Sequence, residues 1–80
     1  MSGEEIETIS RRSLRKFLGA GIAVESDDIM YRGHLGETED GSLCVADPDG
    51  NIIRPELKKG DYILLTVNRN GKQITGVYRL

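Results

Sequence analysis

The chain has 80 residues, of which 38% are hydrophobic and 30% are charged, and its formal net charge is −2. This length allows one domain, and this composition excludes a disordered acidic or basic tail. The longest apolar stretch, residues 62–67, is far shorter than the roughly twenty residues of a membrane-spanning helix. We therefore expect one small domain over residues 1–80 that has no membrane partner.

The cysteine content and the N-terminus favour a cytoplasmic protein. Cys44 is the only cysteine, so the sequence holds neither an intrachain disulfide nor a zinc motif of the CxxC type. The first residues, Met-Ser-Gly-Glu-Glu, lack the basic segment and apolar run of a signal peptide. A chain of this size without a disulfide or a structural metal gains only a small net stability from its core.

The first third of the chain predicts an amphipathic helix over residues 4–18. Ser2 and Glu5 have the S-x-x-E spacing of a capping box. Apolar side chains then recur at helical spacing, namely Ile6, Ile9, Leu14, Phe17 and Leu18. Gly19 and Gly21 favour the end of the helix. Residues 19–28 are predicted as a linker, although Ser26 also suits the cap of a short helix.

Residues 29–80 are predicted to form β-hairpins. A Glu-Asp-Gly turn at residues 39–41 is expected to place Leu35 opposite Val45. Asn70-Gly71 is the favoured dipeptide of a two-residue type I′ turn, and it follows the strongest strand pattern in the chain. The expected fold is therefore α+β. It has an N-terminal amphipathic helix on a curled antiparallel sheet of four or five strands in meander order, either open or curled into a partly open small barrel.

The turn at Asn70-Gly71 fixes the register of the last hairpin. Side chains alternate at period two, so one face carries Ile63, Leu65, Val67, Ile74 and Tyr78 and is expected to meet the helix. Tyr62, Leu64 and Val77 then point the other way, where a solvated sheet would be polar. We predict that these three residues form a protein interface. Alternatively, the first hairpin or residues 22–28 cover them.

A basic cluster on the predicted helix is the candidate nucleic-acid contact. Its members are Arg11, Arg12, Arg15 and Lys16. A structural explanation competes with this one. Acids precede bases along the helix, in the order that the helix dipole favours, and Glu7 lies four residues before Arg11. We favour the structural explanation.

No catalytic, cofactor-binding or metal-binding set is predicted. His34 and Cys44 fall on one face of the first hairpin but diagonally, about 7–8 Å apart, which is too far for a hydrogen bond. An EF-hand starting at Asp47 would need Gly at position six and Glu at position twelve, where Ile52 and Lys58 stand. We therefore expect no enzyme, no cofactor and no small-molecule substrate.

Residues 54–64 read Arg-Pro-Glu-Leu-Lys-Lys-Gly-Asp-Tyr-Ile-Leu. This segment resembles the P-x-L-x-x-G-D motif before a strand in LexA-type repressor peptidases and signal peptidases. In that family a Ser-Met pair precedes the motif and the serine is the nucleophile. Ile52-Ile53 stand at those positions here, so the resemblance implies no peptidase activity.

Two function classes follow from these features. The favoured one is a non-catalytic protein-interaction or adaptor module, whose partner is another protein or a second copy of the chain. The alternative is a nucleic-acid-binding or transcription-regulatory domain that uses the basic helix face. Salt-dependent nucleic-acid binding separates the two classes.

Overall fold

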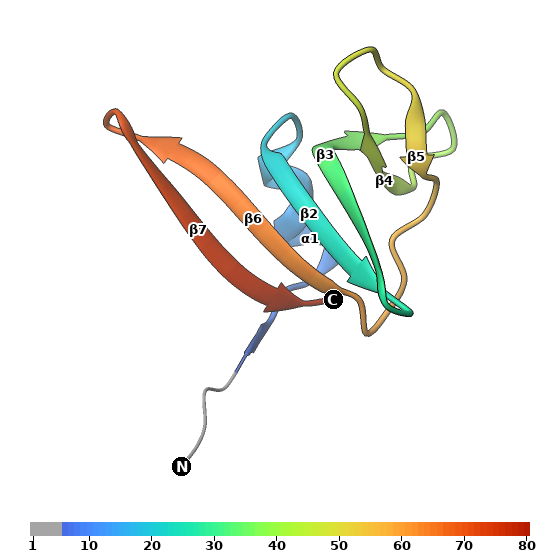
Figure 1. Ribbon diagram of the computed structural model, residues 1–80, viewed down its shortest axis with the longest axis horizontal. Coiled ribbons are helices and arrows are strands. Elements are labelled where there is room, and N and C mark those ends of the chain that lie inside the picture. The colour runs from blue at the N-terminus through green and yellow to red at the C-terminus, as the bar shows by residue number, and fades with distance from the viewer. Residues whose placement is uncertain (1–5) are drawn as a thin grey trace.

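The computed structural model describes residues 6–80, which form one mixed sheet of seven strands (Figure 1). The strands are β1 (Glu7–Thr8), β2 (Gly21–Ser26), β3 (Ile29–Glu37), β4 (Leu43–Ala46), β5 (Ile52–Arg54), β6 (Tyr62–Arg69) and β7 (Lys72–Arg79). Their order in the sheet is β1-β7-β6-β2-β3-β4-β5. β1 runs parallel to β7, and the other neighbouring strands are antiparallel. The two edge strands do not pair, so the sheet is open rather than a barrel.

The predicted α+β fold with a helix over residues 4–18 is wrong, because the described chain is mostly β. The helical part is one α-turn, α1 (Arg11–Leu14), that continues into a 3-10 turn, η1 (Arg15–Phe17). Ser10 caps α1, since its hydroxyl accepts a hydrogen bond from the backbone N–H of Ser13 at 3.1 Å. The predicted capping box of Ser2 and Glu5 lies outside the described residues. Neither described helix is long and apolar enough to cross a membrane.

The edge of the sheet explains why the helix begins late. β1 pairs with β7, and the N–H of Ile9 donates to the carbonyl of Arg79 at 2.9 Å. These backbone groups therefore bond to another strand rather than along a helix. The apolar periodicity was misleading: Ile9 is buried, but Ile6 and Leu18 are 41% and 45% exposed.

The linker predicted at residues 19–28 is also wrong, because it contains the central strand of the sheet. β2 pairs with β3 on one side and with β6 on the other. Ile22 and Val24 alternate toward the core. Asp27 and Asp28 have φ values of +52° and +66° and form the tight turn into β3, as suits residues that tolerate the left-handed region. β6 pairs with β2 and not with β5, so the predicted meander order is wrong.

Both predicted hairpin registers are confirmed. Leu35 pairs with Val45 in the first hairpin. In the last hairpin, Leu64 pairs with Val77 across the sheet. Asn70 and Gly71 have φ values of +54° and +81°, which is the conformation of a type I′ turn.

The core lies on one face of the sheet, which we call the inner face. α1, η1 and the loop at residues 55–61 cover this face. Its buried apolar members are Ile9, Leu14, Ile22, Val24, Leu35, Leu43, Val45, Leu57, Ile63, Leu65 and Leu80. The opposite, outer face of the sheet carries Tyr62, Leu64 and Val77, as alternation at period two requires.

A partly buried ion pair joins β5 to the start of β6. Arg54 Nη2 lies 2.9 Å from Asp61 Oδ2, and the two side chains are 14% and 6% exposed. Arg54 also donates to the hydroxyl of Ser26 at 3.2 Å and lies 5.2 Å from the ring centre of Tyr31. The same Asp61 oxygen accepts the N–H of Lys58 at 3.0 Å. The Gly-Asp sequence before β6 therefore has a structural role in this chain.

Candidate functional site

The outer face crosses four adjacent strands, β7, β6, β2 and β3. The register places Val77, Leu64, Ala23 and Arg32 in one row across these strands. The next row holds Arg79, Tyr62, Glu25 and Met30. Val77 is 46% exposed and Met30 is also exposed, whereas Tyr62, Leu64 and Ala23 are half-buried among their neighbours. An apolar strip of Val77, Leu64 and Ala23 therefore runs across the sheet, with Arg32 at one end and the row that contains Arg79 and Glu25 along one side.

The three predicted interface residues, Tyr62, Leu64 and Val77, lie together on this face. Residues 21–26 do not cover them, because β2 pairs edge to edge with β6. The first hairpin, β3 with β4, continues the sheet on the far side of β2. Ala23 was not predicted on this face, because its segment, residues 19–28, was assigned to a linker. Met30 lies in the predicted hairpin region, residues 29–80, but was not assigned to this face. The alternation of apolar Ile22 and Val24 with the residues between them is the sequence signal that could have identified β2 and its outer face.

A shallow depression of about 370 Å³ lies in the middle of the outer face. Small residues of β2, Gly21 and Ala23, line it, with Leu64 on β6 and Met30 on β3 at its sides. A Cβ atom added at Gly21 would meet no atom closer than Thr66 Cβ at 3.8 Å, so the space above this strand is open. The outer face thus carries a half-buried leucine with a hollow beside it.

A cation–π contact orients the aromatic side chain of the outer face. The guanidinium of Arg79 lies 4.6 Å from the ring centre of Tyr62 and donates a hydrogen bond to its hydroxyl. Such stacking restricts the rotamers of both side chains before any partner binds. Arg79 and Tyr62 therefore form a pre-organised corner of the face.

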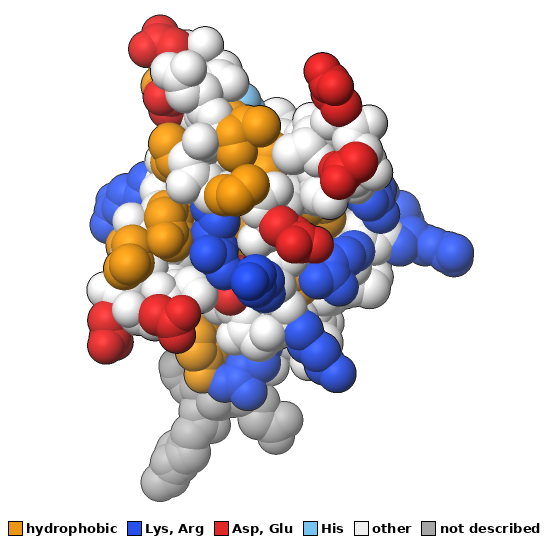
Figure 2. Space-filling model, turned by 90° about the vertical axis from the view of Figure 1, so that its right-hand side faces the viewer, with side chains coloured by type: hydrophobic (Ala, Val, Ile, Leu, Met, Phe, Trp, Pro, Cys, Tyr) orange, Lys and Arg blue, Asp and Glu red, His pale blue; other side chains and the backbone are white. Residues whose placement is uncertain are grey.

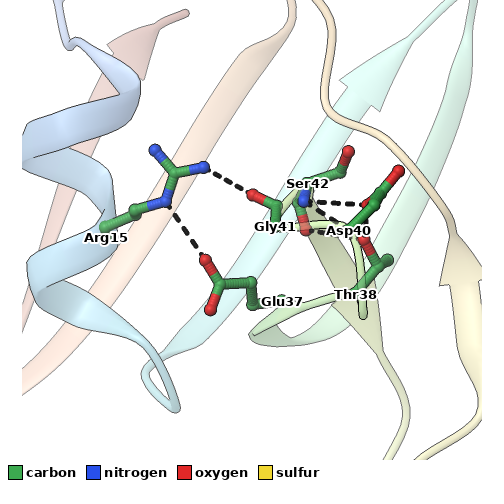
Figure 3. Close-up of polar contacts among 6 residues, drawn as sticks. All are labelled: Arg15, Glu37, Thr38, Asp40, Gly41 and Ser42. Carbon is green, nitrogen blue, oxygen red and sulfur yellow. Dashed lines mark hydrogen bonds and ion pairs between the residues drawn. The ribbon is translucent and has the colours of Figure 1, made fainter.

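The four predicted nucleic-acid contacts divide into two pairs. Arg11 donates to the carbonyl of Leu57 at 3.1 Å, which ties α1 to the loop before β6. Arg15 binds the turn between β3 and β4, through Glu37 and the carbonyl of Gly41 (Figure 3). The other two, Arg12 and Lys16, are exposed and make no side-chain hydrogen bond or ion pair within residues 6–80.

Carboxylates organise the two turns that flank β4. Asp40 accepts hydrogen bonds from the hydroxyl of Thr38 and the N–H of Ser42 (Figure 3), and these bonds hold the pKa of Asp40 below its usual value of 3.8. Asp47 accepts the N–H of Asn51 at 2.8 Å, and this bond likewise lowers the pKa of Asp47. Asp47 therefore acts as a turn residue, which agrees with the failure of the calcium motif.

These lowered pKa values predict a loss of stability in acid. A carboxylate whose folded pKa lies below its unfolded pKa stabilises the fold above the unfolded value, near 3.8. That contribution is lost as the pH falls through the folded pKa. We expect the thermal midpoint to fall more steeply below pH 4 in the native chain than in an Asp40→Asn/Asp47→Asn variant. Equal slopes in circular dichroism melts between pH 5 and pH 2.5 would contradict this explanation.

The other candidate reactive residues do not assemble into a catalytic group. His34 pairs with Ala46 and Cys44 pairs with Gly36, as the predicted diagonal placement requires. Cys44 is buried, and burial raises the pKa of its thiol, which disfavours the nucleophilic thiolate. Within residues 6–80 no three His, Cys, Asp or Glu side chains are grouped to hold a metal ion.

Comparison with known proteins adds no relative to this description, since no family model, curated protein or solved structure matches the chain.

Proposed function

We propose that this chain is a non-catalytic interaction module of the cytoplasm that binds a protein through the outer face of its sheet. The supporting observation is the apolar strip of Val77, Leu64 and Ala23, with exposed Met30 beside it. Contiguous accessible apolar surface on a small sheet is typical of interaction sites. Arg79, Glu25 and Arg32 at its borders supply the polar rim of such a site.

The proposed partner is a second copy of the chain. A two-fold axis parallel to the strands would bring β6 of one copy over β2 of the other, so that Leu64 enters the hollow at Ala23 in both directions. The same operation places Tyr62 over Glu25 of the other copy, with Arg79 alongside. An apolar side chain and a hollow on one face provide the self-complementarity that a symmetric dimer needs.

This dimer should be weak. Four strands spaced about 4.8 Å apart span roughly 15–20 Å, so the contact falls short of the roughly 800 Å² per partner of a standard interface. We therefore expect a dissociation constant in the micromolar range. Sedimentation velocity should be measured up to several hundred micromolar protein.

Val77→Lys should weaken dimerisation at least tenfold, because it introduces a charge into the apolar strip. Ile74→Lys is the matched control: Val77 and Ile74 lie on the same strand and are 46% and 47% exposed, but they point to opposite faces. The control should sediment like the native chain. Equal effects of the two substitutions would contradict a contact through the outer face.

Leu64→Lys separates an interface from a core position. Leu64 is half-buried, so the folded monomer should survive the substitution with a similar circular dichroism spectrum while self-association is lost. An unfolded Leu64→Lys variant would make Leu64 a core residue. A native chain that stays monomeric over the whole concentration range would exclude the second copy as partner.

A further inference from the structure

The fold brings together two segments of the sequence that contain no acidic residue. All thirteen Asp and Glu residues lie in residues 1–7 and 25–61. Residues 8–24 and 62–80 have none, but they hold seven of the eleven bases, namely Arg11, Arg12, Arg15, Lys16, Arg69, Lys72 and Arg79. The net charge of −2 therefore conceals two regions of opposite sign.

These two segments are neighbours in space. β2 and β6 pair from Gly21 opposite Thr66 to Glu25 opposite Tyr62. Phe17 and Ala20 pack with Val67 against the same core. A depression of about 350 Å³ is lined by residues 19–21, 66–68 and Gln73, which come from both segments. We call residues 8–24 and 62–80 together the acid-free half of the molecule.

The end of the β6–β7 hairpin projects from the acid-free half as an arm, residues 67–74 (Figure 1). β2 pairs with β6 only as far as Thr66. Beyond that point, among the described residues, β6 and β7 pair only with each other. Every residue from 68 to 75 is exposed. The polar side chains near the tip are two bases and three amides: Arg69, Lys72, Asn68, Asn70 and Gln73.

The side of β4 and β5 carries charges of both signs. Figure 2 views the molecule from the side of β4 and β5, and acidic groups lie at several places on this surface among the basic and hydrophobic ones. Residues 25–61 supply ten of the acids and only four bases, Arg32, Arg54, Lys58 and Lys59. Residues 25–61 thus have a formal charge of −6 (four bases less ten acids), whereas the charges of the arm are all positive, so a polyanion is attracted more strongly toward the arm.

We propose that the β6–β7 arm binds double-stranded DNA by entering its major groove. This groove is about 12 Å wide and admits a two-stranded β-ribbon. Asn68 and Gln73 form a cross-strand pair on one face of the arm, and their amides match the N6 donor and N7 acceptor of adenine. Arg69 and Lys72 form the next pair, on the other face, and provide positive charge for phosphates. Arg12 and Lys16, also in the acid-free half, are available for phosphates.

The acidic residue paired with β7 lies far from the tip of the arm. Glu7 is the acid that β1 places beside β7, and it lies opposite Tyr78, seven residues from Gly71 at the tip. At about 3.3 Å per residue this is roughly 23 Å along the strand. The Debye length is about 10 Å at 0.1 M salt, so this charge is largely screened at the tip.

Fluorescence anisotropy with a labelled 20-base-pair DNA duplex tests the proposal, with salt varied from 50 to 200 mM. The test variant is Arg69→Gln/Lys72→Gln, and the matched control is Lys58→Gln/Lys59→Gln, which removes the same charge from exposed positions in the acidic part. The arm variant should bind at least tenfold more weakly at 50 mM salt. Its slope of log affinity against log salt should be shallower by about 1.8, because about 0.9 is lost for each phosphate contact.

The control should bind like the native chain. Equal weakening by the two variants would show a general charge effect and would overturn the proposal, as would the absence of native binding at 50 mM salt. A duplex RNA of the same sequence is the second probe, because its major groove is too narrow for the arm. RNA binding as tight as DNA binding would overturn groove entry. Equal affinity for poly-glutamate would overturn DNA as the partner.

Discussion

Replacing Gly33 with alanine should unfold most of the domain, with a loss of about 3 kcal/mol or more. A Cβ atom at this position would lie 2.1 Å from the carbonyl oxygen of Ala46 and 2.9 Å from its carbonyl carbon. These are backbone atoms of β4, which is held between β3 and β5, so they have little freedom to retreat. A thermal midpoint at least 10 °C lower is expected for a chain of this length.

Gly21→Ala is the control for this substitution. Gly21 also lies in a strand, but a Cβ atom there would have Thr66 Cβ at 3.8 Å as its nearest neighbour, an ordinary contact. Alanine has less conformational freedom than glycine in the unfolded chain, so Gly21→Ala should stabilise the fold by about 0.4–1 kcal/mol. If the midpoints of Gly33→Ala and Gly21→Ala were the same, the close approach of β3 and β4 at Gly33 would not be a constraint.

Asp61→Ala should destabilise the domain by about 3–5 kcal/mol, because it leaves the guanidinium of Arg54 poorly solvated and without its counter-charge. It also removes the acceptor for the N–H of Lys58, which shapes the loop before β6. Urea denaturation monitored by circular dichroism measures this loss. A double variant, Arg54→Met/Asp61→Leu, should recover much of it, since neither charge then remains buried.

The exposed ion pair of Arg15 and Glu37 provides the comparison for the buried one. Their side chains are 43% and 40% exposed, and their nitrogen–oxygen distance is 3.2 Å. Solvent screening limits such a pair to about 1 kcal/mol or less, so Glu37→Gln should change the urea midpoint only slightly. If Asp61→Ala changed the urea midpoint as little as Glu37→Gln does, the ion pair of Arg54 and Asp61 would not stabilise the fold.

The elements that the sequence predicted correctly depend on local geometry. The turns at residues 39–41 and 70–71 require a chain reversal of defined length, and alternation then fixes every cross-strand pair. For this reason Tyr62, Leu64 and Val77 could be assigned to one face before the structure was known. Two further apolar members of the outer face, Ala23 and Met30, come to lie beside these residues through the pairing of β2 with its two neighbours.

By itself, the sequence determined the hairpins, their registers and the shared face of the predicted interface residues, because turn residues and period-two alternation act within one hairpin. Only the tertiary structure decided the state of residues 6–9 and 21–26, because distant strands offer their backbone groups better partners than a local helix or loop does. It also decided the charge distribution. Residues 8–24 and 62–80 are far apart in the chain, and the pairing of β2 with β6 joins them into one acid-free half.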